Sequence, residues 1–407
     1  MIDFELPPQA KMAVKMVRGM AEGIFRKHAR YYDDHEHEPR GETPKELKPL
    51  ASMGASALSS EKKDKKPKEK KDEKKKEPGM RGLISILAAE EMAWGDAGLM
   101  LCLPGLGLGN AAIAAVATPE QKERFGNVFA AMAITEPGCG SDTASITTTA
   151  VHDKETNEWI LNGEKIFVTS GDRCGAVVVW ATVDKSAGRA GIKSFVVPKG
   201  TPGMTVTKLE HKLGIRASDT ASIVLEDCRI PYNNILGNPE VVKDKTTAGF
   251  KGVMATFDAT RPAVAAMALG VARAALEFTR EKLEEQGIEF RYGVGKHRLS
   301  AVEKDMFEME ANLEAARLLI WRAASLMDHG LRNSLEASMA KQKAGRAATL
   351  VTQKCVELLG SIGYSRELLV EKWMRDSKIN DIFEGTGQIQ TLIVARHILG
   401  FGRDMLK

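Results

Sequence analysis

The chain of 407 residues is poor in cysteine and in aromatic residues. Its five cysteines are widely spaced and include no C-x-x-C pair, so the sequence signals neither a disulfide framework nor a metal site. No apolar run reaches the roughly 18 residues that a membrane span requires. The start of the chain lacks a basic stretch followed by an apolar run, which is the pattern of a secretory or transit signal. We therefore expect a cytoplasmic protein with free thiols and no membrane span.

The excess of basic residues is concentrated in one segment. The formal net charge is +4, and residues 61–77 (EKKDKKPKEKKDEKKKE) hold ten lysines and six acidic residues, which accounts for that excess. Such a run is typical of a solvated insertion, with docking to an anionic surface as the alternative. The remainder has no arginine-rich patch with interleaved aromatic residues, so we predict no nucleic-acid binding.

The composition is that of a globular protein, and the length predicts two or three domains. Residues 1–132 are predicted to form an N-terminal α-helical domain, which the lysine-rich insertion interrupts at about residues 59–79. LISILAAEEMAW repeats apolar residues at helical spacing. Thr118-Pro119-Glu120 is typical of the start of a helix.

Residues 133–240 are predicted to form a middle β domain, an antiparallel sandwich or small barrel. Short β-favouring runs alternate there with turn residues every eight to twelve positions. These runs are ITTTAVH, EWILNG, AVVVWATV, KSFVVP, MTVTKL and ASIVLED. Asn162-Gly163 predicts a hairpin turn between WIL and EKIFV, because both residues tolerate a positive φ.

Residues 241–407 are predicted to form a C-terminal α-helical bundle. Three segments, at residues 261–285, 301–329 and 336–360, are long enough for bundle helices and have alanine-rich faces for close packing. The order of helices, strands and helices shows no βαβ alternation, so a Rossmann domain is not expected. GLGLGN at residues 105–110 follows a helical segment and not a strand, which argues against a phosphate-binding loop.

A glycine-containing loop, AITEPGCGSD at residues 133–142, opens the β-rich region. Two glycines and a proline predict a tight turn that presents backbone amides and the hydroxyls of Thr135 and Ser141. Such donors suit the acceptor-rich groups of a cofactor. A plain Gly/Pro turn fits the same composition.

Four segments together carry a family resemblance. AITEPGCGSD is followed by LNGEKIFVTSG (161–171), FDATRP (257–262) and MRDSKINDIFEGTGQIQTLIVAR (374–396). In this order the segments resemble the acyl-CoA dehydrogenase family over about residues 80–407. The resemblance implies an N-terminal helical domain, a middle β domain and a C-terminal four-helix bundle, with FAD between the last two. It also implies dehydrogenation of an acyl-CoA thioester to the 2-enoyl-CoA, with electrons passed to an electron-transfer flavoprotein.

By this resemblance Glu384 is the catalytic base. It removes the α-proton while flavin N5 takes the β-hydride, and the Glu384 N–H and a flavin ribityl hydroxyl polarise the thioester oxygen. A carboxylate flanked by Ile382-Phe383 should lie in an apolar slot that raises its pKa. Gly385 leaves room for the backbone to approach the substrate. A helix-capping or surface glutamate is the alternative.

The resemblance assigns further binding roles. The predicted cofactor contacts are Thr135, Gly140, Ser141, Phe167 and Thr169 around the flavin and its phosphate, and Thr386 and Gln388 near the adenosine half. Phe167 stands where many members have tryptophan. The predicted substrate contacts are Ser141, Gly385, Asp258 and Arg261. Asp258 and Arg261 are expected at the start of a helix that lines the acyl channel, with Pro262 in the first turn and helix capping as the alternative.

Two positions depart from the family pattern. Glu289 and Glu357 stand where members place an arginine and a glutamine on the FAD of a neighbouring subunit, and Arg291 is the nearest substitute for the arginine. We therefore expect a tetramer that is either homomeric or completed by a paralogous subunit.

The alternatives for function are an acyl-CoA oxidase and a non-catalytic assembly subunit. Flavin-dependent monooxygenases share the fold but do not need Glu384. Met100 replaces the arginine with which glutaryl-type members bind a distal carboxylate, and this disfavours that arrangement. Straight-chain, branched, sterol-side-chain and aryl-substituted acyl groups all remain open.

Overall fold

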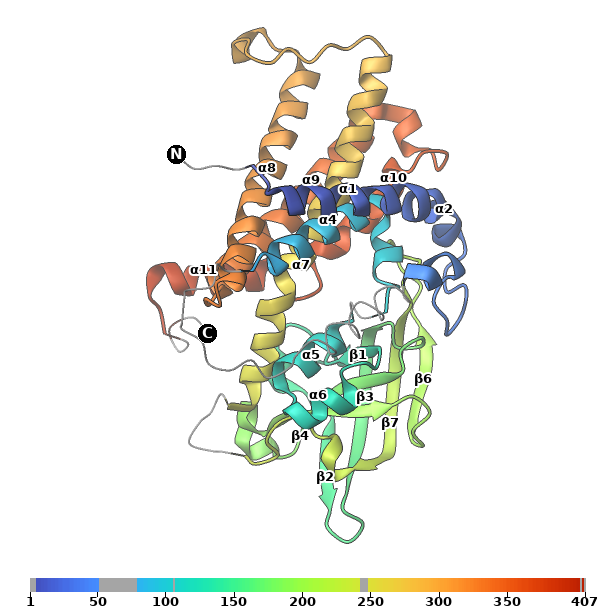
Figure 1. Cartoon of the computed structure of the whole chain (residues 1–407), viewed down its shortest axis with the longest axis vertical. Coiled ribbons are helices and arrows are strands. Elements are labelled where there is room, and N and C mark those ends of the chain that lie inside the picture. The colour runs from blue at the N-terminus through green and yellow to red at the C-terminus, as the bar shows by residue number, and fades with distance from the viewer. Residues whose placement is uncertain (1–4, 51–78, 105–106, 242–247, 403–404, 406–407) are drawn as a thin grey trace.

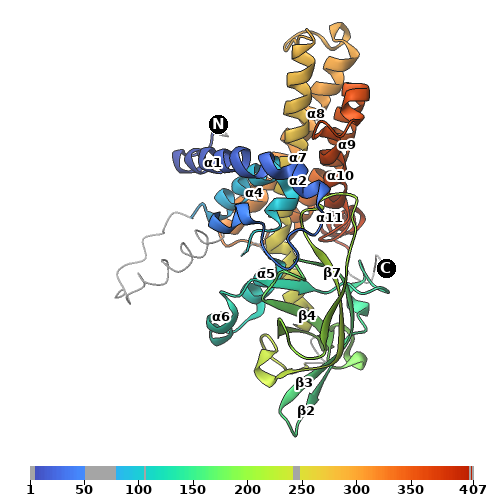
Figure 2. The same cartoon turned by 90° about the vertical axis from the view of Figure 1, so that its right-hand side faces the viewer.

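A computed structural model describes residues 5–50, 79–104, 107–241, 248–402 and 405. The predicted lysine-rich insertion lies outside these residues, apart from residue 79. Most of the helices gather at one end of the molecule and the β-sheet forms the other, as both views show (Figures 1 and 2). The helical, β-rich and helical regimes predicted from the sequence are therefore all present.

The N-terminal region is helical. Its elements are α1 (Pro8–Met20), a π-helical turn (Ala21–Arg26), α2 (Lys27–Asp34), a 3-10 turn (Lys45–Leu47), α4 (Arg81–Met100), α5 (Leu108–Val116) and α6 (Pro119–Phe125). The predicted helix start is confirmed, because Thr118 caps α6 through reciprocal side-chain bonds with Gln121.

Residues 107–110 of the glycine-rich segment are described by the structure, and their two glycines allow close packing. A Cβ on Gly107 would lie 2.5 Å from the Ala130 carbonyl oxygen, and one on Gly109 would lie 2.3 Å from that of Ala131. These glycines therefore allow α5 to approach the first strand closely.

The middle region is one curled sheet of seven strands. They are β1 (Ala130–Ala133), β2 (Thr149–Asp153), β3 (Glu158–Thr169), β4 (Ala176–Thr182), β5 (Ile192–Pro198), β6 (Met204–Leu209) and β7 (Thr220–Pro231). The order is β1-β4-β2-β3-β7-β6, with β5 paired to β4. The predicted fold class is confirmed, although the sheet is mixed, because β4 pairs in parallel with both β1 and β2.

The predicted hairpin at Asn162-Gly163 is wrong. Both residues lie inside β3, and the hairpin that joins β2 to β3 turns at residues 154–157, where Asn157 has φ 55°. Gly163 is needed for a close approach, because a Cβ there would lie 2.5 Å from Thr148 Oγ1. A β-bulge in the pairing with β7 follows Leu161, next to this glycine.

The C-terminal region contains the predicted helices. They are α7 (Ala248–Glu285), α8 (Ala301–Asp328), α9 (Ser334–Tyr364), α10 (Val370–Ser377) and α11 (Gly387–Leu399). The three long helices were predicted within a few residues, except that α7 begins well before residue 261.

The expected position of Asp258 and Arg261 at a helix start is therefore wrong. Both residues lie inside α7, and so does Pro262. The preceding segment AGFKGVMAT has no proline and extends the helix backwards. Pro262 has no N–H for the Asp258 carbonyl, so one helical hydrogen bond is missing beside the two predicted site residues.

Helix α7 is the central element of the molecule. It runs from the sheet toward the far end of the helical region (Figure 1). Residues Thr256–Glu285 have the length and apolar composition of a membrane span, but 72% of their most apolar window is buried inside the protein. This burial identifies α7 as a core helix.

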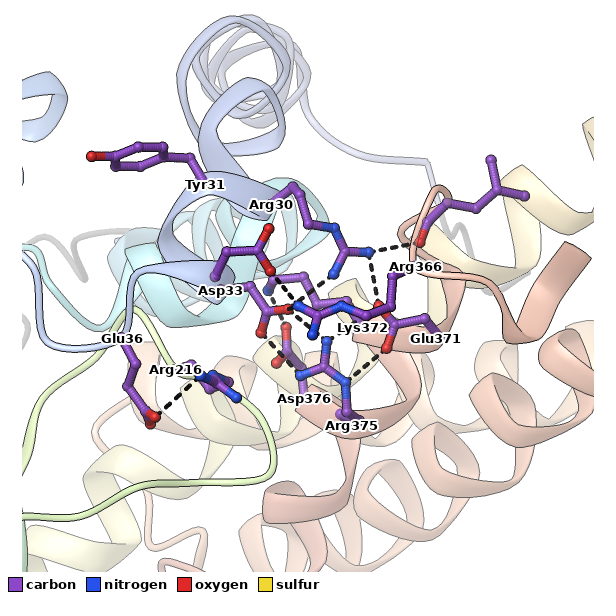
Figure 3. A network of polar contacts seen from close by, with 12 residues as sticks. Arg30, Tyr31, Asp33, Glu36, Arg216, Arg366, Glu371, Lys372, Arg375 and Asp376 are labelled. Atoms are coloured by element: carbon purple, nitrogen blue, oxygen red, sulfur yellow. Dashed lines mark hydrogen bonds and ion pairs between the residues drawn. The ribbon is translucent and has the colours of Figure 1, made fainter.

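A network of ion pairs ties the N-terminal helices to α10, which precedes the Glu384 segment (Figure 3). The carboxylate of Asp33 on α2 is fully buried and pairs with Arg375 on α10 at 2.6 Å. Lys372 on the same helix is buried between Asp96 and Asp376, with both oxygens at 2.5 Å. The Asp33–Arg375 and Asp96–Lys372 pairs therefore join α10 to α2 and α4.

Candidate active site

Glu384 lies in a tight turn between a 3-10 helix (Lys378–Asp381) and α11. Its φ is 57° and that of Gly385 is 87°, so two successive residues are left-handed. For a glutamate this conformation is costly, and it is found mainly where the surrounding structure enforces it. A Cβ on Gly385 would lie 2.5 Å from Gln390 Nε2, so glycine is required there.

The Glu384 carboxylate has a single hydrogen-bond donor among the described residues. The side chain is half-buried, and Oε2 accepts a bond of 2.9 Å from the Thr260 hydroxyl of α7. Burial raises the pKa of Glu384, although the Thr260 bond and the charges of Arg261 and Lys341 act in the opposite direction. Because only one donor in the described part of the chain occupies the carboxylate, its second oxygen is available to accept a proton.

The apolar flank of Glu384 differs from the expectation. Phe383 packs against the helical core, whereas Ile382 is 51% exposed. Of the two expected apolar neighbours, only Phe383 therefore packs into the protein, and α7 supplies the contact from Thr260 to the carboxylate.

Helix α7 contributes an oriented cation beside the turn. Arg261 is 2% exposed, and its Nη1 pairs with Asp258 Oδ1 at 2.9 Å. Asp258 Oδ2 in turn accepts a bond of 2.5 Å from Ser334. An ideal Cβ on Gly385 would lie 3.9 Å from Arg261 Nη2. The structure thus brings together Asp258, Arg261, Glu384 and Gly385, all four predicted from the sequence.

Three residues of this site were not predicted. They are Thr260, Lys341 and Gln390. Thr260 lies within the FDATRP segment, from which only Asp258 and Arg261 were predicted as site residues. Lys341 interrupts the alanine-rich face of α9, and a lysine on a buried helical face is the sequence signal that could have found it.

The loop after β1 forms a second group of predicted residues. Thr135 is half-buried, whereas Gly140 and Ser141 are exposed, and a Cβ on Gly138 or Gly140 would meet nothing within 4 Å. The loop therefore presents an open, donor-bearing surface.

The base of this loop is fixed by Glu136, which sequence reasoning missed. Glu136 is 4% exposed and pairs with the buried Lys165 at 2.7 Å. Its oxygens also accept from the backbone and hydroxyls of Thr147 and Thr148. Burial favours the neutral acid, but Lys165 and the two threonines lower the pKa of Glu136 to about 2. It is therefore a structural anion.

Phe167 and Thr169 lie at the end of β3. Phe167 has φ 55° and is 60% exposed, at the register shift between Lys165 and Val168. The shift turns a flat aromatic face outward, and Thr169 beside it is half-buried. An exposed ring, nearby hydroxyls and an open glycine loop fit a planar cofactor with a phosphate-bearing arm, which is the chemistry of FAD.

Thr386 and Gln388 lie at the start of α11. The Thr386 hydroxyl accepts a bond of 3.3 Å from the Ile389 N–H, so this residue caps the helix. Gln388 is exposed in the first turn. Their assignment to the adenosine half of FAD stays a prediction.

The two groups are not joined by direct polar contact. Hydrogen bonds connect the residues around Glu384, but among the described residues no hydrogen bond or ion pair links them to Thr135, Ser141, Phe167 or Thr169. The roles predicted for all these residues stay predictions.

The two departures from the family pattern lie on the surface. Glu289 is exposed, and the Arg291 guanidinium is held on Glu303 by bonds of 2.9 and 2.6 Å, so Arg291 is not free to substitute for the missing arginine. Glu357 pairs with Lys354 at 3.0 Å and lines a cavity of about 350 Å³ along α9.

Comparison with known proteins identifies the same family that the motif segments resemble. Residues 247–399 match the acyl-CoA dehydrogenase C-terminal domain, and residues 131–228 match the acyl-CoA dehydrogenase middle domain. The short-chain specific acyl-CoA dehydrogenase of Bos taurus is 41% identical over 288 residues, which are 69% of this chain and 67% of that protein. The alignments with the mammalian relatives span about two thirds of those proteins.

Two further comparisons cover nearly the whole chain. A short-chain specific acyl-CoA dehydrogenase of Clostridium acetobutylicum is 33% identical over 98% of this chain and 100% of that protein. The solved structure of butyryl-CoA dehydrogenase from Megasphaera elsdenii matches with a TM-score of 0.81 and 32% identity, again over 98% and 100%. The chain belongs to the acyl-CoA dehydrogenase family of oxidoreductases.

Proposed function

We propose that this chain is an FAD-dependent acyl-CoA dehydrogenase that oxidises a short acyl-CoA thioester to the 2-enoyl-CoA. The observation that carries this proposal is the partner-poor carboxylate of Glu384. It lies on a strained turn that only an enforced geometry would hold, and it is flanked by a buried arginine. Electrons would leave the enzyme through an electron-transfer flavoprotein.

The proposed chemistry begins with the removal of an α-proton by Glu384. FAD supplies the hydride acceptor when it is bound. The raised pKa makes Glu384 a stronger base than an exposed glutamate, and a substrate that excludes water strengthens this effect. The Glu384 N–H lies on the same turn and is the donor that we assign to the thioester oxygen as negative charge develops there.

The β-domain residues would hold the isoalloxazine ring and the phosphates. Phe167 offers its exposed ring for stacking, and Thr135 and Thr169 offer hydroxyls to the ring edge. The open loop at Gly140 and Ser141 offers donors to the phosphate, while Thr386 and Gln388 face the adenosine half. These assignments come from the family resemblance, and the exposure of Phe167, Gly140, Ser141 and Gln388 supports them.

The short-chain assignment is supported by relatives that are named short-chain specific acyl-CoA dehydrogenases and by a solved structure of a butyryl-CoA dehydrogenase. Met100, buried at the end of α4, provides no cation for a distal carboxylate. Butanoyl-CoA is therefore the first substrate to test, with hexanoyl-, isobutanoyl-, glutaryl- and phenylpropanoyl-CoA as a panel.

The assembly that we propose is a tetramer completed by a paralogous subunit. Two carboxylates, Glu289 and Glu357, replace the groups that would contact a neighbour's pyrophosphate, and Arg291 is engaged by Glu303. Expression of this chain alone tests the point. A homotetramer with one FAD per chain and full activity would rule out the required partner.

The function is tested by a dye-coupled assay without oxygen, run over the acyl-CoA panel. We expect a yellow protein that reduces the dye with butanoyl-CoA, with only background activity in Glu384→Gln. Peroxide formation in air at a rate equal to dye reduction would instead indicate an oxidase. A protein that retains no flavin when co-expressed with its candidate partner would indicate a non-catalytic subunit.

A further inference from the structure

Lys341 is a buried cation directly behind the Glu384 turn. It lies on α9, is 1% exposed, and donates from Nζ to the Gly385 carbonyl oxygen at 2.6 Å. Among the described residues no carboxylate lies within ion-pair distance of this ammonium. Burying an unpaired charge is costly, so a lysine at this place needs a reason beyond packing.

The same carbonyl has a second, uncharged donor. Gln390 on α11 is fully buried and donates from Nε2 to Gly385 O at 3.1 Å and to Glu384 O at 3.3 Å. The turn is thus held from two sides, by a cation on α9 and an amide on α11. A hydrogen bond alone does not explain the lysine, because the glutamine already satisfies this acceptor.

The charges around the turn indicate what the ammonium adds. Glu384 faces Arg261 from α7 and Lys341 from α9, while Lys341 also faces Asp381 of the 3-10 helix. Arg261 is already engaged by Asp258 at 2.9 Å. Lys341 therefore carries the positive charge behind the turn that no ion pair within 4.0 Å neutralises.

We propose that Lys341 is a positioning residue that holds the Glu384–Gly385 peptide in its left-handed turn and, through its charge, keeps the Glu384 carboxyl ionised when the site is dry. The inference rests on the proposed function only in naming Glu384 as the base. Burial raises the pKa of Glu384, and the Lys341 ammonium acts against this rise together with the Thr260 hydroxyl and Arg261, so its removal should shift the carboxyl further toward the protonated form. Burial lowers the pKa of Lys341 itself to about 8, so the charge is present at neutral pH.

Two substitutions separate charge from hydrogen bonding. Lys341→Met removes the charge and one donor, whereas Gln390→Met removes a neutral donor to the same carbonyl. Infrared titration of the FAD-loaded enzyme without substrate reads the Glu384 carboxyl directly, with Glu384→Gln used to assign the band. We expect Lys341→Met to move this titration upward by about one pH unit and Gln390→Met to leave it within about 0.3 unit.

Two further variants keep the test decisive. Lys341→Arg retains the charge, and we expect its carboxyl to titrate close to that of the unmodified enzyme. Lys341→Gln, which keeps a donor and loses the charge, replaces the methionine variant if the latter does not fold, with the same upward shift expected.

The outcomes are distinguishable from failure of the proposed function. Equal shifts in the Lys341 and Gln390 variants, or no shift in either, would overturn the role of the charge. Because the infrared readout needs no turnover, a clear Lys341-dependent shift in an enzyme inactive on every acyl-CoA would support the coupling while rejecting the proposed reaction.

Discussion

Two glutamates in two short turns of this chain, Glu136 and Glu384, have opposite surroundings. Glu136 follows β1 and accepts hydrogen bonds from Lys165, Thr147 and Thr148, which lower its pKa to about 2. Glu384 precedes α11 and accepts one hydroxyl bond, and burial raises its pKa. The donors around a carboxylate therefore decide whether its pKa falls or rises when water is excluded from it.

The largest effect is expected from removing the fixed anion. Glu136→Gln leaves Lys165 buried without a counter-charge and should lower the free energy of unfolding by about 3–5 kcal/mol. Because the pKa of Glu136 is lowered on folding, its stabilising contribution is present above about pH 4.5 and is lost as the pH falls toward 2. Urea unfolding of both proteins between pH 3 and 7 measures the loss of stability in the variant and its dependence on pH.

The matched control is the double variant Glu136→Gln/Lys165→Met. It removes both charges and should recover part of the lost stability. A loss below about 1 kcal/mol in the single variant would show that the pair is not the structural anchor of the loop.

The next effect concerns the only hydroxyl that donates to Glu384 in the described structure. Thr260→Val removes a bond that favours the ionised carboxylate, so the pKa of Glu384 should rise further. The acid limb of kcat/KM should then move upward by up to about one pH unit. Thr256→Val is the control, because its hydroxyl bonds the Gly252 carbonyl one turn earlier on α7. Equal pH profiles for both variants would contradict the assignment.

The smallest effect is a gain in stability. Glu384→Gln replaces a half-buried carboxylate that accepts a single hydrogen bond among the described residues, and it should raise the free energy of unfolding at pH 7 by about 1 kcal/mol. Since the pKa of Glu384 is raised on folding, the difference should vanish when the pH falls below the ordinary range of glutamate. Thermal unfolding at pH 4 and pH 7 checks the sign, and a destabilised variant at pH 7 would show that Glu384 serves the fold.

The sequence predicted the helices and strands better than it predicted which residues contact one another. The helices α7, α8 and α9 were predicted from the length of their segments and their alanine-rich faces. The motif segments pointed to Glu384, Gly385, Asp258 and Arg261. The hairpin at Asn162-Gly163 was predicted wrongly because a glycine required for contact with Thr148 has the same sequence signature as a turn glycine. Local composition does not distinguish the two.

The two glutamates show why the site itself was harder to predict. Both are followed within two residues by a glycine in a short turn, so the local sequence does not show which glutamate has many partners. Their partners lie far away in sequence, with Lys165 at a separation of 29 residues from Glu136 and Thr260 at 124 from Glu384. Lys341 was missed for the same reason, because the carbonyl that it contacts lies 44 residues later in the chain.

The most direct test of the account is the reduction of bound flavin in a single turnover. FAD-loaded enzyme and the Glu384→Gln variant are mixed with butanoyl-CoA in the absence of oxygen and acceptor, and the flavin absorbance is followed. We predict that the variant binds the thioester but loses absorbance at least about 100-fold more slowly. Loss of flavin absorbance at the unmodified rate in Glu384→Gln would contradict the assignment of this carboxylate as the base.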